Sequence, residues 1–182
     1  MVLRTMARTR VEFDPDVDIH GGELIAGRPV LITSGHFLLN VTMSRPLFDE
    51  GRELTVTFGR PREPVYYFGT TVPLPSLLIS PYILLHMRRA MAKGSVGFLI
   101  AESATPEKDW LAIETAVGTR YVSPVLFAYV TRTATPLVFG ATYLSPSGRL
   151  TITYEKPQAT DANGMFAEYC DFLRRHVARV VR

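Results

Sequence analysis

The sequence predicts an α/β fold with a mainly parallel sheet, helices on both faces, and a C-terminal β-hairpin followed by a helix. Two observations predict it. Short apolar runs, typical of buried strands, alternate along the chain with segments of helical spacing. Near the C-terminus, two strand-like runs are separated by a short turn-forming stretch and are expected to pair at one edge of the sheet. The chain of 182 residues fits a single domain, residues 1–182.

The N-terminal half supplies the first strands. Residues 1–20 are polar and charged, which predicts a loosely attached leader. Residues 29–33 (PVLIT) are expected to form a buried strand, and residues 36–45 a short helix that ends at Pro46, because proline does not continue a helix. Further along, the sequence predicts a strand over 53–58 and a mostly helical segment over 76–93.

The C-terminal half continues the alternation. A buried strand is expected over residues 95–101 (SVGFLIA), whereas residues 102–121 have no clear pattern. Ser123 is expected to cap a helix that runs to about Thr133. The hairpin strands cover residues 137–144 and 150–154. A last helix follows, capped by Asp161 or Asn163, with its apolar residues at helical spacing.

Composition narrows the function classes. The formal net charge of +3 is too small to indicate nucleic-acid binding, so no nucleic acid is expected as a partner. The lone cysteine, Cys170, excludes an internal disulfide and favours a cytoplasmic protein. The longest apolar stretch, residues 76–87, is too short to span a bilayer, so membrane contact is expected to be at most peripheral. No histidine pair has metal-ligand spacing, and nucleotide-binding glycine motifs are missing; neither a metal nor a cofactor is expected.

His36 is the main candidate for chemistry. It follows the predicted strand at 29–33 by three residues, and reactive groups in a parallel sheet gather beyond the carboxyl ends of the strands. Gly35 allows the backbone to approach closely. A histidine in this place suits a general base that acts on a hydroxyl or amine, although a histidine that only completes the turn would give the same pattern.

Four segments resemble the lipid A biosynthesis (lauroyl/myristoyl) acyltransferases, within the lysophospholipid acyltransferase superfamily. They are GRPVLITSGHFLLNV, TFGRPREP, KGSVGFLIAES and VGTRYVSPVLFAYVTRTATPLVFGATYL, which together run from about Gly27 to Leu144. The resemblance implies a short, soluble, divergent member of this group. It also implies acyl transfer from a thioester, on coenzyme A or an acidic acyl carrier protein, to a hydroxyl or amine of a small or carrier-bound acceptor.

The resemblance casts His36 as the general base, but the carboxylate that the family places five residues later is replaced by Val41. Glu102 is the first candidate to supply the missing acid, because it follows a buried strand whose end should face the same side; Glu114 is the second. Alternatively, His36 acts alone on an easier acceptor, or the protein is a non-catalytic member or partner subunit that binds an acyl chain or its carrier.

Substrate contacts are expected from four further residues, Asn40, Arg60, Gly118 and Arg120. The two arginines suit an anion of the acceptor or of the donor's phosphopantetheine. Tyr66, Tyr67 and Phe68 could line an acyl groove or pack in the core. A more distant alternative is an unrelated hydrolase-like enzyme with Ser34 or Ser103 as nucleophile.

Overall fold

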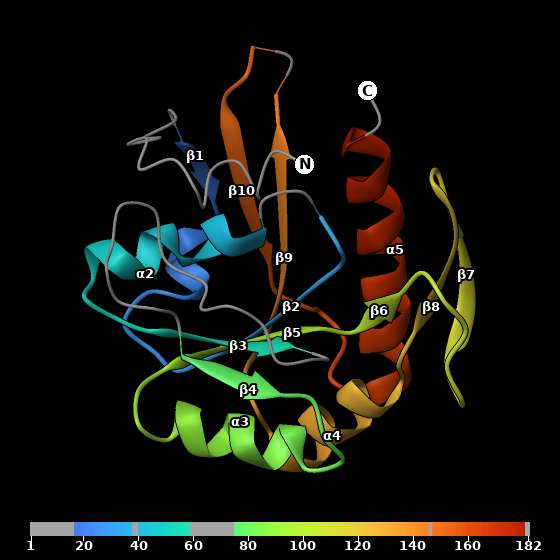
Figure 1. Cartoon of the computed structure of the whole chain (residues 1–182), viewed down its shortest axis with the longest axis horizontal. Helices are drawn as coiled ribbons and strands as arrows, with labels where there is room; N and C mark the ends of the chain where they lie inside the picture. The colour runs from blue at the N-terminus through green and yellow to red at the C-terminus, as the bar shows by residue number, and fades with distance from the viewer. Residues whose placement is uncertain (1–16, 38–39, 59–74, 146, 181–182) are drawn as a thin grey trace.

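A central sheet of seven strands organises the protein, and a separate three-stranded sheet lies beside it (Figure 1). The computed structural model describes residues 17–37, 40–58, 75–145 and 147–180. The strands of the central sheet are β1 (Val17–His20), β2 (Leu31–Ser34), β3 (Leu54–Phe58), β4 (Ser76–Leu78), β5 (Val96–Ile100), β9 (Leu137–Leu144) and β10 (Leu150–Glu155). The smaller sheet contains β6 (Glu102–Ser103), β7 (Leu111–Thr115) and β8 (Gly118–Val122).

Within the described residues, four α-helices and two 3₁₀ helices accompany these strands. The α-helices are α2 (Arg45–Asp49), α3 (Ile83–Met91), α4 (Val125–Thr133) and α5 (Ala162–Val180); the 3₁₀ helices are η1 (Gly22–Leu24) and η2 (Asn40–Ser44). The prediction of a mixed α/β protein with a mostly parallel sheet is therefore confirmed.

The strand order of the central sheet is β1-β10-β9-β2-β5-β3-β4. The five strands from β9 to β4 are parallel to one another, β10 runs antiparallel to β9, and β1 runs parallel to β10. In the parallel register Ser34 pairs with Ile100. The carboxyl ends of β2 and β5 are therefore level, so the residues that follow the two strands start from neighbouring positions.

Alternate residues of the strands enter two separate cores. Leu31 of β2 packs with α3, α4 and α5, whereas Ile32 packs on the opposite face with residues of η2 and α2. This alternation follows from the two-residue period of a strand. Helix α5 is held at its first turn by Asp161, whose Oδ1 accepts hydrogen bonds from the backbone N–H groups of Asn163 and Gly164. Along its length, α5 packs against both β9 and β7, so it joins the two sheets (Figure 1).

The predicted helix over residues 36–45 is wrong in its limits. Residues 36 and 37 are not helical, the 3₁₀ helix η2 begins at Asn40, and α2 begins at Arg45. Pro46 therefore lies in the first turn of α2 instead of ending a helix. Proline is tolerated there because the first N–H groups of a helix have no partner inside it.

Three other elements differ from expectation. Residues 76–78, predicted as part of a helix, form β4 beside β3. Ser123 does not cap α4: the residue in that position is Pro124, and the helix start has no side-chain cap. The last four residues of the predicted leader form β1, which pairs with β10 from Val17 to His20. None of the described helices has the length and apolar character needed to cross a bilayer.

Candidate functional site

His36 and Glu102 meet at the carboxyl edge of the parallel sheet. His36 follows β2 by two residues and Glu102 follows β5 by two, and these strands are neighbours. The ring Nδ1 of His36 lies 2.9 Å from Oε1 of Glu102, and the backbone N–H of His36 donates to the same oxygen over 2.7 Å. The Glu102 side chain is 4% exposed, whereas the His36 side chain is 61% exposed. The imidazole is therefore held from the protein side and accessible from the solvent side.

The contacts of Glu102 fix its charge and the tautomer of His36. Burial by itself raises the pKa of Glu102, but the hydrogen bonds from the side chain and backbone of His36, together with the positive charges of His36 and Arg120, lower the pKa below 4.5 overall. An ionised carboxylate can only accept hydrogen bonds. When His36 is neutral, Nδ1 must consequently carry the proton that is shared with Glu102, which leaves the lone pair of Nε2 for a substrate.

Arg120 is the second charged group beside Glu102. Its Nε lies 4.0 Å from Oε2 of Glu102, and Arg120 comes from β8, next to Ile113 of β7. Oε2 is buried and has no hydrogen-bond partner among the described residues. The guanidinium therefore offsets a buried negative charge without a direct hydrogen bond. Arg120 was expected to contact a substrate anion; its contact in the structure is with Glu102, and a substrate contact stays a prediction.

The backbone that carries His36 is held at three successive residues. The hydroxyl of Tyr169 on α5 donates to the carbonyl oxygen of Ser34 over 2.7 Å. The side-chain amide of Asn40 donates to the carbonyl oxygen of Gly35, also over 2.7 Å. Glu102 accepts the N–H of His36, as described above. Asn40, predicted to bind substrate, thus uses its amide to hold the turn, and its predicted contact with a substrate stays untested by this geometry.

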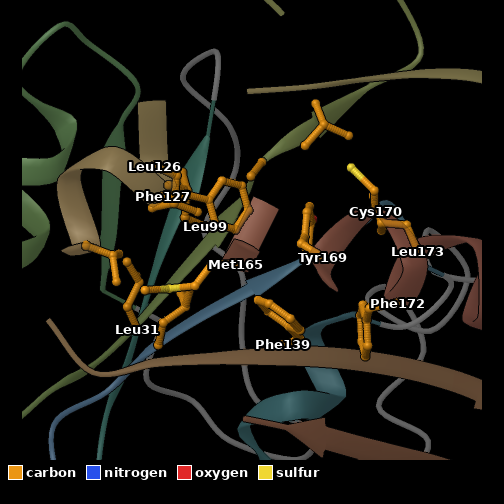
Figure 2. Close-up of a cluster of buried hydrophobic side chains, with 14 of the residues drawn as sticks. Leu31, Leu99, Leu126, Phe127, Phe139, Met165, Tyr169, Cys170, Phe172 and Leu173 are labelled. Atoms are coloured by element: carbon orange, nitrogen blue, oxygen red, sulfur yellow. The ribbon is translucent and has the colours of Figure 1, made fainter. Parts of the chain in front are cut away.

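Close packing restricts the same turn. A Cβ atom at Gly35 would lie 2.7 Å from Cδ2 of Leu173 on α5. Carbon atoms that are not bonded to each other do not approach this closely. Glycine at this position therefore lets the strand end lie directly on the last helix. Figure 2 shows Tyr169 and Leu173 on this helix, with Phe139 and Phe172 beside Tyr169. The ring of Phe37, the residue after His36, meets that of Phe172 edge to face at 6.4 Å.

The other predicted site residues lie elsewhere or outside the described part of the chain. Gly118 occupies the turn between β7 and β8 with a φ of 98°, which explains a glycine there by conformation alone. Glu114, the second candidate acid, accepts a hydrogen bond from the Thr119 hydroxyl on the same exposed hairpin. Arg60 lies outside the described residues, as do the three aromatic residues 66–68.

The hydroxyls of both serines proposed as nucleophiles are engaged in local hydrogen bonds. Ser34 is fully buried, and its hydroxyl donates to the carbonyl oxygen of Gly35 over 3.1 Å. The hydroxyl of Ser103 is bonded locally to Thr105, 3.1 Å away. Neither lies on a strand-to-helix turn of the kind that exposes a catalytic serine.

A second histidine–glutamate pair is present among the described residues, but its histidine is buried. Nε2 of His176 on α5 lies 2.9 Å from Oε1 of Glu155, and Arg175 binds the other carboxylate oxygen. His176 is only 1% exposed and packs against the ring of Phe172. This pair can fasten α5 to β10, whereas the exposed ring of His36 can meet a substrate.

Sequence reasoning missed Tyr169 as part of the site. In the sequence it was one of the apolar residues at helical spacing in the last helix, and nothing in that pattern distinguishes a tyrosine that only packs from one that also donates a hydrogen bond. A buried tyrosine does need a partner for its hydroxyl, which is the one signal that could have been used. No protein-family model and no curated protein matches the sequence significantly.

Proposed function

We propose that the protein is an acyltransferase that moves an acyl group from a thioester to a hydroxyl or amine acceptor, with His36 as general base. The observation that carries this proposal is the exposed His36 ring with a buried, ionised glutamate 2.9 Å from its Nδ1. The carboxylate orients the ring and stabilises the positive charge that the ring acquires when it takes a proton.

The reaction is balanced in protons. As the acceptor oxygen or nitrogen bonds to the thioester carbonyl carbon, its proton passes to Nε2 of His36. The carbon–sulfur bond then breaks, and the leaving thiolate takes this proton from the imidazolium, which restores neutral His36. The chemistry needs a base that is accessible on one side and charge-stabilised on the other. The exposures of His36 and Glu102 support that requirement.

The contact of Glu102 with His36 favours an acyltransferase over a protein that only binds an acyl chain or its carrier. The reason to consider a protein that only binds an acyl chain or acyl carrier protein was Val41, which leaves the family's motif without its acid. A carboxylate from β6 now contacts the same imidazole, so the valine no longer argues against proton transfer. The donor, coenzyme A or an acidic carrier protein, and a cytoplasmic location remain part of the proposal.

The test is turnover with defined thioesters. The purified protein is incubated with acyl-coenzyme A or acyl carrier protein of varied chain length and with amine or hydroxyl acceptors, while released thiol and acylated product are measured. We expect His36→Ala to lower turnover by about a hundred- to ten-thousand-fold. His20→Ala removes an exposed histidine from β1 and serves as the matched control with unchanged turnover.

Two outcomes would contradict the proposal. Product formed equally well by His36→Ala would remove His36 from the mechanism. Thioester binding without product from any acceptor would favour the binding protein instead.

A further inference from the structure

Residues 78–85 (LISPYILL) form an exposed apolar segment at the end of β4 and the start of α3. Leu78, Ile79, Tyr82 and Leu85 are each between 44% and 67% exposed. They are four of the nine large hydrophobic residues that are exposed in the described part of the chain, and they fall within eight consecutive positions. Scattered exposed apolar residues need no explanation, but a contiguous group of them marks an interaction surface.

Helix α3 continues this surface with basic residues. Met87 and Met91 are buried and face the sheet, where α3 packs on β5. Leu85 and Arg89 are both exposed and lie four positions apart, so they share one side of the helix. Arg88 is also exposed in this helix, and Lys93 follows its end. The outer side of α3 therefore passes from apolar to basic along its length.

The charged residues within this stretch of the sequence have one sign. Between Glu63 and Glu102 the sequence contains no aspartate or glutamate. No described carboxylate forms an ion pair with Arg88, Arg89 or Lys93. A solvated helix usually mixes both signs of charge, whereas a helix without acidic residues is complementary to an anionic surface.

The segment lies at the same edge of the sheet as His36. Leu78 pairs with Phe58, Val56 pairs with Phe98, and Ser34 pairs with Ile100. Leu78 and Ser34 are thus level in the register, three strand spacings apart, or about 14 Å. Because α3 runs from the end of β4 to the start of β5, its apolar end lies at this edge and its basic end points to the other (Figure 1).

We propose that residues 78–85, together with Arg88, Arg89 and Lys93, dock the protein on the surface of an anionic lipid bilayer. The apolar side chains enter the boundary between headgroups and acyl chains, Tyr82 lies at the headgroup level, and the basic residues contact lipid phosphates. The order of apolar and then basic side chains matches the order of acyl chains and then phosphates in an anionic bilayer; an acidic protein partner would instead give no binding to anionic vesicles. The proposal is independent of acyl transfer by the protein.

Vesicle co-sedimentation of the full chain tests this docking. We expect binding to vesicles of equal parts phosphatidylglycerol and phosphatidylcholine, and much weaker binding to phosphatidylcholine alone. Combining Arg89→Glu with Lys93→Glu should weaken binding to the anionic vesicles by at least about tenfold. Ile79→Glu and Leu85→Glu should each weaken it as well, because a charged side chain cannot enter the acyl region.

Two control variants have matched chemistry away from this surface. Ile19→Glu introduces a charge at an exposed apolar residue of β1, and Lys156→Glu reverses an exposed positive charge after β10. Both should bind like the native protein, and circular dichroism checks that every variant is folded. Absence of native binding to the anionic vesicles would overturn the proposal. Binding that depends on Arg89 and Lys93 but not on Ile79 or Leu85 would also overturn it, because it would indicate attraction to any polyanion.

Discussion

The hydroxyl of Tyr169 donates a hydrogen bond to the carbonyl oxygen of Ser34 over 2.7 Å, two residues before His36. Tyr169 is fully buried, and burial raises its pKa well above 10.0, so it is a neutral donor at neutral pH. Together with Asn40 and Glu102, it fixes the peptide groups that set the direction of the His36 side chain. The site therefore depends on α5 as well as on the ends of β2 and β5.

Tyr169→Phe should lower turnover without unfolding the protein. The substitution keeps the aromatic packing and removes the hydroxyl, at a cost of about 1 kcal/mol in the free energy of unfolding. Tyr154→Phe is the matched control, since the Tyr154 hydroxyl is also buried and donates to a backbone oxygen, that of Met43, over 2.6 Å, in the core on the other face of the sheet. Both variants should lose similar stability, and only Tyr169→Phe should lower kcat.

Amide hydrogen exchange at His36 makes this comparison independent of activity. Exchange should be faster in Tyr169→Phe and unchanged in Tyr154→Phe, because only the first hydrogen bond holds the turn. Equal exchange and equal kcat losses in the two variants would reduce Tyr169 to a packing residue.

Glu102→Gln should reduce turnover, whereas Glu114→Gln should not. A glutamine oxygen can still accept the hydrogen bonds of His36, but the negative charge that stabilises the imidazolium is lost. Glu114 lies on the exposed hairpin with Thr119 as its partner, so its replacement controls for the loss of one carboxylate. We expect kcat to fall about ten- to a hundred-fold for Glu102→Gln, measured as thiol release. A native rate in this variant would mean that His36 acts as base without the charge of Glu102.

Stability should decrease at acid pH in a way that depends on Glu102. Because the pKa of Glu102 is lower in the folded protein than the ordinary 4.5, its ionised form stabilises the fold above pH 4.5, and this contribution is lost as the pH falls through the folded-state pKa. Urea denaturation of the native protein and of Glu102→Gln at pH 7, 5, 4 and 3 measures it. The difference in unfolding free energy should be smaller at pH 3 than at pH 5; a difference that does not change between these two values would contradict the assignment.

Gly35→Ala should destabilise the protein through a specific contact. The new Cβ would lie 2.7 Å from Cδ2 of the buried Leu173, and overpacking of this kind costs about 1–3 kcal/mol. A double-mutant cycle with Leu173→Ala separates this contact from other effects, since the alanine removes the atom that clashes. Gly35→Ala should cost clearly less in the Leu173→Ala background. An equal cost in both backgrounds would place the strain elsewhere.

The sequence predicted the strands more reliably than the segments between them. Apolar runs such as residues 95–101 and 137–144 became β5 and β9 almost within their predicted limits, because a strand buried on both faces is apolar throughout. Residues 102–121 have no clear pattern in the sequence because most residues of β7 and β8 are exposed or half-buried, so apolar residues do not mark these strands. Pro46 does not mark a helix end in this protein, because proline both ends helices and occupies their first turn.

The candidate site was partly predictable for a related reason. His36 and Glu102 both follow apolar runs, so a parallel sheet brings them to one edge, and their contact could be anticipated from strand order alone. Arg120 was named for a substrate anion, but its closeness to Glu102 depends on how the β7–β8 hairpin folds back, which no local pattern encodes. The same holds for Tyr169, whose partner lies 135 positions away in the chain.

That separation has a consequence for biosynthesis. His36 leaves the ribosome well before Tyr169, whose hydroxyl holds the neighbouring backbone from α5. Contacts between such distant segments form late, since the intervening chain must be ordered first. The turn that carries His36 should consequently gain its fixed geometry only after α5 has been synthesised and has packed against the sheet.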